Sequence, residues 1–388
     1  MERWLVLLPL LLGCWLAGCA SLTPPPPLVD TGLLHDEAFA APSAPIDASA
    51  VFALNETMRH WLATTPANTM HSADPRRHLL DVLYGQRKLV LDYDATLTRN
   101  ASEAFEARSG NCLSLVIMTA AFAKAAGLPV EFRQVQVDEA WTRSNGLYFA
   151  AGHVNLALGW PVARSRFERE QDSLMIVDFL PSEEVRGLRS RPISEATVLA
   201  MYMNNRAAEA LARGAIDDAY WWAREAVRQD RRFLTAYNTL GVIYVRRGEQ
   251  RWAQQAFQAV LAREPDNTKV MGNLARALLA DGRDAEAQPL LARLAALEPY
   301  PPFHFLQAGL AAMQTQDWRQ ARDLFRKEAA RQAYNPEVHF WLAQASYQLG
   351  DLRGADRHLE LARQNSATPQ DHALYAAKLG WLRARTLN

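Results

Sequence analysis

Residues 108–127 read Arg-Ser-Gly-Asn-Cys-Leu-Ser-Leu-Val-Ile-Met-Thr-Ala-Ala-Phe-Ala-Lys-Ala-Ala-Gly, and they put a single thiol, Cys112, at the start of a predicted helix. Turn and cap residues precede the cysteine, apolar residues recur after it at helical spacing, and Gly127-Leu-Pro129 ends the helix. A cysteine in a first helical turn faces unpaired backbone N–H groups and the positive end of the helix dipole, which favour thiolate over thiol. The stretch therefore predicts a chemically primed cysteine.

The length and charge of the chain narrow the possibilities. At 388 residues the chain is too long for one ordinary hydrophobic core, so two folded units are expected. Its 42 basic and 42 acidic residues cancel. A chain without net charge gives no indication of a nucleic-acid partner, and the composition is that of a soluble globular protein.

The first residues depart from that composition. Arg3 is followed by an apolar run from Trp4 to Trp15 and then by Leu16-Ala-Gly-Cys19, which together have the three regions of a secretory signal. The run is too short to span a bilayer comfortably. Its end resembles the lipobox of bacterial lipoproteins, which implies that residues 1–19 are a lipoprotein signal peptide and that Cys19 is acylated and becomes the new N-terminus. The alternative is an ordinary signal with chance cysteines.

Two expectations concern the residues that follow the predicted signal, one from the resemblance and one from composition. By the family rule, Ala20 rather than Asp after the cysteine implies the bacterial outer membrane, with the protein held there by its lipid and facing the periplasm. Residues 20–50 predict an extended, Pro-rich tether, because four consecutive prolines (Pro24 to Pro27) are followed by two more.

The cysteine count isolates the primed thiol. Of three cysteines, Cys14 would leave with the signal and Cys19 would carry lipid, so Cys112 has no intramolecular disulfide partner. A lone thiol in an oxidising compartment is an oxidation liability, which makes a chemical role a serious explanation. The alternative is a small buried residue at a helix start.

Residues 51–190 predict helices followed by an antiparallel sheet, an α+β unit. Helices are expected from about Val51 to Leu62, from Pro75 to about Lys88 and from Thr98 to Phe105, and strands over 130–137, 147–158 and 174–180, with a solvated hairpin loop at 163–172.

Two residues of the predicted sheet are candidates for chemistry. In the alternation from His153 to Leu158 the apolar residues share one face, so His153 points to the other, together with Asn155 and Ala157. Asp178 lies within an apolar run, where an acid is costly unless it is paired, and a histidine is the obvious partner. The alternatives are a satisfied sheet histidine and a strand-end acid that bonds nearby backbone.

The order Gly-Asn-Cys112, Gly-His153-Val and Val-Asp178-Phe resembles the bacterial transglutaminase-like branch of the papain-like cysteine enzymes. The resemblance covers about Asn55 to Pro181 and includes the helix end Gly-Leu-Pro129. It implies Cys112 as nucleophile, His153 as its base and Asp178 as the group that orients the imidazole.

The backbone of the nucleophile is a candidate for stabilising the oxyanion that thiolate attack creates. The N–H of Cys112 lies at the helix start, where such a donor is unpaired. The candidates for a second hydrogen-bond donor to the oxyanion are Tyr93, Asn100 and Asn111, and the sequence leaves the choice among them open. No Cys-x-x-Cys or His-x-x-x-His spacing indicates a metal, and no cofactor is expected.

From about residue 200 the chain repeats every 34 residues. The alanines at 219, 253, 287, 321 and 355 mark the period, with a small residue twelve positions before each. This is the tetratricopeptide signature, and it predicts five repeats over 200–367 and a capping helix over 368–388. Such arrays stack into a curved surface whose groove usually holds a peptide or protein. The aromatics Trp221, Trp222, Tyr237 and Tyr244 either line that groove or belong to the interhelix core.

Together these patterns predict a lipid-anchored, transglutaminase-like cysteine enzyme over 51–190. It would hydrolyse a peptide or glutamine amide through a thioester, with the repeats recruiting a protein partner or substrate. An amine acceptor in place of water would make it a cross-linker. The alternative is a non-catalytic tetratricopeptide scaffold lipoprotein for an envelope complex.

Overall fold

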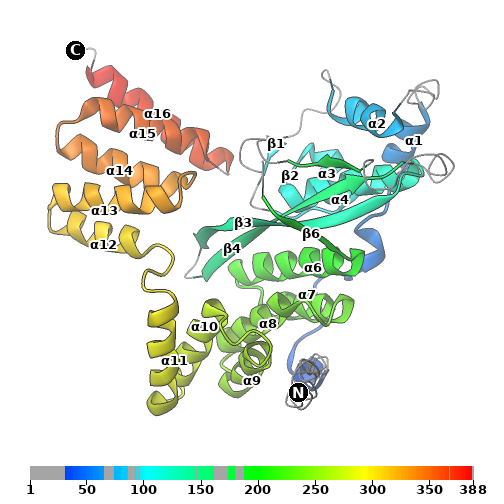
Figure 1. The fold of residues 1–388 in the computed structure, drawn as a ribbon, viewed down its shortest axis with the longest axis horizontal. Helices are drawn as coiled ribbons and strands as arrows, with labels where there is room; N and C mark the ends of the chain where they lie inside the picture. Colours follow the sequence, from blue (N-terminus) through cyan, green and yellow to red (C-terminus); the bar gives the residue numbers. More distant parts are fainter. Residues whose placement is uncertain are drawn as a thin grey trace, which may run out of the picture.

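The computed structural model describes residues 31–64, 74–85, 92–94, 97–144, 147–160, 174–179, 188–366 and 368–386. The predicted signal peptide with Cys19 and the predicted loop at 163–172 lie outside the described residues. The chain forms an N-terminal region with helices and a small antiparallel sheet, followed by an all-helical array (Figure 1). None of the helices in the described ranges combines the length and apolar character needed to span a bilayer.

The N-terminal region follows the predicted order. Its elements are α1 (Glu56–Thr64), α2 (Pro75–Tyr84), β1 (Asp92–Tyr93), α3 (Ala101–Ala107), β2 (Ser109–Gly110), α4 (Cys112–Ala125), β3 (Val130–Ser144), β4 (Leu147–Leu158), β5 (Met175–Val177) and β6 (Ser190–Ile193). Strands β5, β4, β3 and β6 lie in that order in one antiparallel sheet, and β1 pairs with β2 in parallel.

Helix α4 is the centre of this region. Its residues from Leu113 to Ala123 are all buried, so the helix is enclosed on every side rather than amphipathic. Strand β4 lies against it, and Phe122 contacts Trp61 of α1 and Phe105 of α3 through their rings. The predicted helix is confirmed, and Gly127, with φ of +73°, turns the chain into β3 as its missing Cβ allows.

The sheet is larger than its sequence indicates. β3 continues past residue 137 to Ser144, because it pairs with β4 almost to the tip of their hairpin. β6 is not among the strands predicted from the sequence, and it contains Pro192. A proline is tolerated there because β6 is the outer strand of the sheet and pairs with β3 alone.

The array consists of helix pairs, as the 34-residue period predicts. Its helices are α6 (Glu195–Ala212), α7 (Ile216–Gln229), α8 (Leu234–Arg247), α9 (Gln250–Leu261), α10 (Thr268–Ala280), α11 (Asp284–Leu297), α12 (His304–Gln314), α13 (Trp318–Arg331), α14 (Pro336–Gln348), α15 (Leu352–Gln364) and α16 (Pro369–Thr386). Small residues lie where paired helices cross. A Cβ on Gly241 would lie 2.4 Å from the Phe257 ring, and one on Gly309 would lie 2.4 Å from the Phe325 ring.

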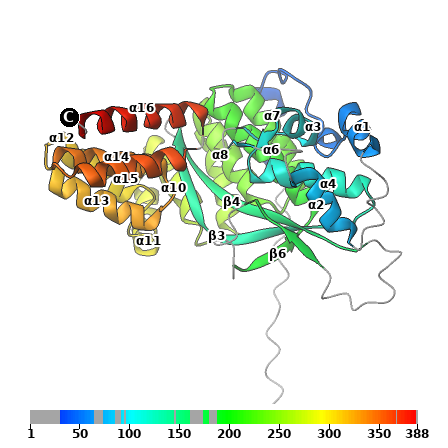
Figure 2. The ribbon, with the colours of Figure 1, turned by 90° about the horizontal axis from the view of Figure 1, so that it is seen from above.

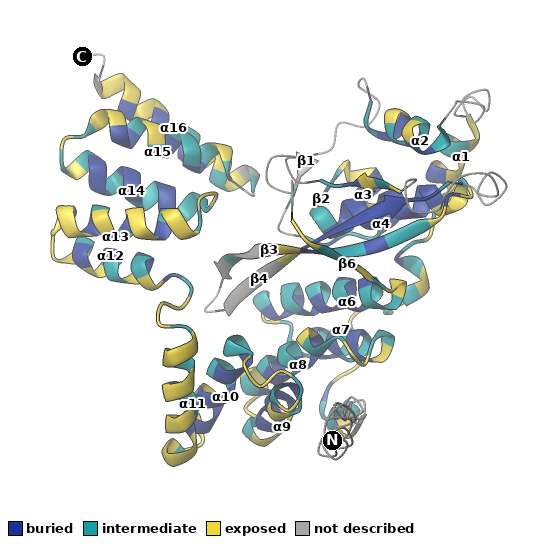
Figure 3. Cartoon of the chain, in the orientation of Figure 1, coloured by how far each residue is buried: buried dark blue, intermediate teal, exposed yellow. Residues whose placement is uncertain are grey.

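The five repeats do not form one continuous stack. Helices α6 to α11 share a core with the N-terminal region, whereas α12 to α14 form a separate core (Figure 1, Figure 2). Helix α11 is exposed along much of its length (Figure 3), and Leu297 at its end is 46% exposed. The interruption at 298–303 has a physical cause, because Glu-Pro-Tyr-Pro-Pro-Phe cannot continue a helix and Phe303 has φ of +62°.

The expected tether is wrong for residues 31–50. This N-terminal strap (residues 31–50) packs on α7, α8 and α9 instead of extending into solvent. Phe39 stacks on Tyr220 with ring centroids 3.8 Å apart, and Asp36 accepts from Tyr220 at 2.6 Å and from Arg224 at 2.8 Å. Tyr244 donates to the carbonyl of Leu33 at 2.6 Å. The prolines at 42 and 45 favour an open chain, but the acidic and aromatic residues before them, Asp36 and Phe39, hold the segment on the helices.

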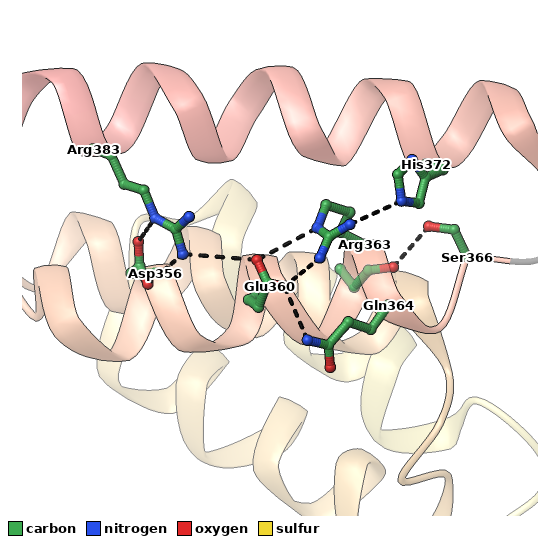
Figure 4. A network of polar contacts seen from close by, with 8 residues as sticks. Asp356, Glu360, Arg363, Gln364, Ser366, His372 and Arg383 are labelled. Atoms are coloured by element: carbon green, nitrogen blue, oxygen red, sulfur yellow. Dashed lines mark hydrogen bonds and ion pairs between the residues drawn. The ribbon is translucent and has the colours of Figure 1, made fainter.

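Helix α16 caps the array. Arg383 of α16 pairs with Asp356 of α15 at 2.6 Å and lies 3.7 Å from Glu360 (Figure 4). At the other end of the interface, Arg363 and His372 are 3.0 Å apart. These contacts lie outside the buried Leu379 and Leu382, which close the last apolar face.

Candidate active site

The first turn of α4 fixes the position of Cys112. Asn111 caps the helix, and its side-chain oxygen accepts from the backbone N–H and the hydroxyl of Ser114, both at 2.9 Å. Gly110 packs against the same serine, because a Cβ there would lie 2.7 Å from Ser114 Cβ. Cys112 is a free cysteine of intermediate exposure, so its side chain is not walled off.

Strands β4 and β5 bring the predicted histidine and aspartate together. Their register pairs Leu156 with Val177, so Asp178, the next residue, lies beside Asn155. His153 Nε2 lies 2.7 Å from Asp178 Oδ1, and Asn155 Nδ2 donates to Asp178 Oδ2 at 2.8 Å. The histidine is only 3% exposed, so the acid and the imidazole meet in a buried place, where pairing matters most.

The imidazole also interacts with the cysteine. Cys112 is the second side chain that acts on the imidazole, and because Asp178 occupies Nε2, Nδ1 is the nitrogen left for the thiol. Burial lowers the pKa of His153, but the hydrogen bonds to Asp178 and Cys112 outweigh it and raise this pKa to about 9. The three residues that the sequence singled out thus lie in one line from sulfur to carboxylate.

The Cys112 backbone N–H is available to an oxyanion. Among the described residues no oxygen accepts it, as expected for the first residue of a helix. None of the three residues considered as a second oxyanion donor can be assigned that role: two make other hydrogen bonds, and the side chain of the third is not described. Asn100 caps α3, and Asn111 donates its amide to Thr98 Oγ1 at 2.8 Å. The Tyr93 side chain lies outside the described residues.

Asn155 belongs to the site, although the sequence indicated only the face on which it lies. It is two residues from His153 on β4, so the two side chains point to the same side of the sheet. A polar residue two positions from the histidine was the signal that could have identified the second partner of Asp178.

The four aromatic residues considered as lining of the repeat groove differ in their exposure to solvent. Tyr237 and Tyr244 are 1% and 0% exposed and therefore belong to the core between helices. Trp221 is partly exposed and donates its indole N–H to the Ala40 carbonyl at 2.6 Å, and Trp222 is also partly exposed. The tyrosines therefore follow the core alternative.

The geometry supports nucleophilic chemistry at a carbonyl. In such an arrangement the imidazole accepts the thiol proton, which activates the sulfur, and later donates a proton to the leaving group. The carboxylate fixes the orientation of the imidazole. Within the described ranges no three metal-ligating side chains cluster.

Comparison with known proteins identifies the repeats. A tetratricopeptide repeat family model matches residues 252–310. Cellulose synthase operon protein C of Komagataeibacter sucrofermentans is 34% identical over 121 residues, which are 31% of this chain and 9% of that protein. Cellulose synthase 1 operon protein C of Komagataeibacter xylinus is 31% identical over 146 residues, or 37% and 11% of the two chains. The chain spans about a tenth of the length of these curated relatives.

The solved structures to which the chain is similar are more distant in sequence. One concerns pilF of Pseudomonas aeruginosa, which is 22% identical and covers 48% of this chain and 84% of its own, with a TM-score of 0.29. Another is a thermophilic TPR protein of Thermus thermophilus, which is 19% identical over 46% of this chain and 98% of its own, with a TM-score of 0.30.

The chain is thus a tetratricopeptide repeat protein with distant homology to cellulose synthase operon protein C. The matched family segment, 252–310, includes none of Cys112, His153 and Asp178. The transglutaminase-like resemblance of the N-terminal region therefore stays a prediction, and the site rests on its own geometry.

Proposed function

We propose that the chain is a protein-binding repeat protein whose N-terminal region carries a cysteine-dependent acyl-transfer site. The observation that carries this proposal is the grouping of Cys112, His153 and Asp178: the thiol lies at a helix N-terminus and acts on the imidazole, which is hydrogen-bonded to an aspartate that Asn155 also holds. The substrate class is a peptide or glutamine amide, and the acceptor is water.

The residues account for both halves of such a reaction. The thiol proton passes to His153, whose raised pKa keeps it there as the imidazolium, and Cys112 Sγ then attacks the amide carbon, forming a C–S bond and an oxyanion near the Cys112 N–H. The imidazolium then gives its proton to the departing nitrogen as the C–N bond breaks, which releases an amine and leaves a thioester. Water loses a proton to His153, attacks the thioester and expels the sulfur as the C–S bond breaks.

The repeats supply the second half of the proposal. Tetratricopeptide arrays present an extended surface that binds peptides or proteins, and the family match supports such a role here. We propose that the array brings a protein partner or substrate to the N-terminal region.

A second candidate is a scaffold without catalysis, and the comparisons favour it. The curated relatives and the family model match the repeats, where no chemistry is expected. In this case the N-terminal region would serve assembly in an envelope complex, and Cys112 would have only the reactivity of a simple thiol.

A cysteine-directed electrophile on a short peptide separates the two candidates. The enzyme predicts covalent labelling of Cys112, seen as a mass increase, that is absent in Cys112→Ser and strongly reduced in His153→Ala. Glu56→Gln, a change at an exposed position of α1, should label like the wild type. If Cys112 is labelled no faster than a free thiol such as glutathione, the enzyme is rejected and the scaffold is the candidate that remains. Cys112→Ala used as bait, which could retain an uncleaved substrate, would then identify what the site binds.

The anchor is a separate part of the proposal. We propose an outer-membrane lipoprotein that faces the periplasm, on the strength of Leu16-Ala-Gly-Cys19 after an apolar run. Radiolabelled palmitate should enter the wild type and Cys14→Ala but not Cys19→Ala. Incorporation into Cys19→Ala would refute the lipid anchor without touching the cysteine site.

A further inference from the structure

Thr98 joins the candidate site to the first helix of the repeats. It is 1% exposed and lies before α3, far in sequence from α6. Every polar atom of this residue is paired. Its N–H donates to Glu209 Oε1 at 2.6 Å, its carbonyl accepts from Arg206 at 3.0 Å, and its Oγ1 accepts from Asn205 at 3.2 Å.

The same hydroxyl supports the nucleophile. Asn111, the residue before Cys112, donates its amide to Thr98 Oγ1 at 2.8 Å, while its oxygen caps α4 at Ser114. The backbone N–H of Arg99, next to Thr98, donates to Ser114 Oγ at 2.8 Å. Two hydrogen bonds therefore run from the segment at 98–99 to the turn that places the sulfur.

Helix α6 is the part of this network that belongs to the array. Asn205, Arg206 and Glu209 lie within about one turn of α6, and all three converge on Thr98. The Glu209 side chain is only 14% exposed. Glu209 Oε2 and Arg206 Nε form an ion pair at 3.6 Å, so the two side chains that bond Thr98 also hold each other.

We propose that Thr98 is a positioning residue for Cys112 and that helix α6 holds it in place, so that the first repeat is a structural part of the cysteine site. The inference rests on the proposed function, because it concerns the reactivity of the same thiol. A displacement of α6 would move the Asn111 cap and, with it, the sulfur relative to His153. The repeats would then influence the chemistry through a few hydrogen bonds.

The test is the rate at which iodoacetamide alkylates Cys112 in the full chain at about pH 7. Thr98→Val keeps the shape and removes the hydroxyl, and it should lower the rate by roughly tenfold or more, since small misplacements of reacting groups cost that much. Thr98→Ser restores the hydroxyl and should recover most of the wild-type rate. Glu209→Met, which acts from α6, should lower the rate in the same direction.

Glu195→Gln is the matched control. Glu195 also joins α6 to α4, through an ion pair with Lys124 at 2.5 Å, but at the far end of α4, so this variant should react like the wild type. Circular dichroism checks that every variant is folded, and if Thr98→Val is not, Asn205→Ala takes its place with the same expectation.

The outcomes separate the two proposals. A wild type that reacts no faster than glutathione overturns the proposed function and this inference with it. A fast wild type whose rate is unchanged in folded Thr98→Val and Glu209→Met overturns the positioning role alone. Equal losses in Thr98→Val and Thr98→Ser would overturn it too, because the hydroxyl would then not be responsible.

Discussion

Asp178 is held on both carboxylate oxygens, one by the His153 ring and the other by the Asn155 amide. The arrangement has a cost, since the Asn155 Oδ1 atom is buried without a partner, which costs about 1–3 kcal/mol of folding free energy. At this position the orientation of the aspartate takes precedence over full pairing of the asparagine. A buried carboxylate in this position fixes the orientation and tautomer of the imidazole that activates a nucleophile.

Replacing the aspartate by its amide therefore tests the line of three residues. Asp178→Asn removes the charge that raises the pKa of His153, so the rate of Cys112 labelling by the peptide electrophile should fall about 100-fold or more. Asp81→Asn, at an exposed position on α2, should leave the rate unchanged. If Asp178→Asn labels as fast as the wild type, the aspartate has no part in activating the thiol.

The raised pKa of His153 also predicts how stability depends on pH. Because the folded value of about 9 exceeds the ordinary value of about 6.5, protonated His153 stabilises the fold fully below pH 6.5. This contribution is lost as the pH rises from about 6.5 through about 9. In urea unfolding, the stability advantage of wild type over His153→Gln should therefore shrink across that window. An advantage that grows with pH would contradict the assigned direction.

At the scale of elements, the repeats depend on close helix crossings. Gly241 and Gly309 occupy equivalent positions in the second and fourth repeats, and each meets a buried phenylalanine ring from the partner helix. The ring fills the space that the glycine leaves empty. A methyl group there must displace a side chain that is enclosed on all sides.

Gly241→Ala and Gly309→Ala should each lower the free energy of unfolding by about 1–3 kcal/mol, because overpacking outweighs the gain in helix propensity. Gly380→Ala is the matched control, since a Cβ at this helical position of α16 meets nothing within 4 Å. It should be neutral or stabilise by up to about 1 kcal/mol. Urea denaturation followed by circular dichroism measures all three. Equal effects at the three glycines would mean that the rings do not set the crossings.

Local patterns predicted most elements, and contacts between distant segments account for the rest. The cap at Asn111 and the following apolar residues predicted α4, and the alternation from His153 predicted β4. The Thr98 network could not be predicted, because its partners lie 13 and more than 100 residues away. The 34-residue period likewise predicts each helix pair, but it does not predict the interruption of the stack at 298–303, a segment that contains three prolines.

At the scale of the whole molecule, two segments tie the parts together. The N-terminal strap crosses α7, α8 and α9, and the hairpin of β3 and β4 reaches the far repeats (Figure 2). The ring centroid of Trp141, near the hairpin tip, lies 5.4 Å from Lys269 Nζ of α10. The backbone carbonyl of Trp141 accepts a hydrogen bond from the Asn335 side chain, which caps α14, at 3.4 Å. The hairpin thus contacts repeats on both sides of the interruption.

The strap should contribute to the stability of the first repeats. Phe39 is 7% exposed between Tyr220 and Arg247, so Phe39→Ala should lower the free energy of unfolding by about 3 kcal/mol or more. Glu37→Ala in the same strap should have little effect, because that side chain is 77% exposed. Thermal unfolding of both variants is the measurement. A Phe39→Ala variant as stable as Glu37→Ala would show that the strap does not support the array.

The most direct test of the cysteine site is an NMR titration of the His153 ring in chain labelled with ¹⁵N-histidine, assigned by its loss in His153→Gln. If the ring lies between Cys112 and Asp178 as described, it stays protonated through neutral pH and loses its proton near pH 9, and Cys112→Ala lowers this pKa. A ring that titrates at about 6.5, the ordinary value for histidine, and that does not respond to Cys112→Ala would contradict the account.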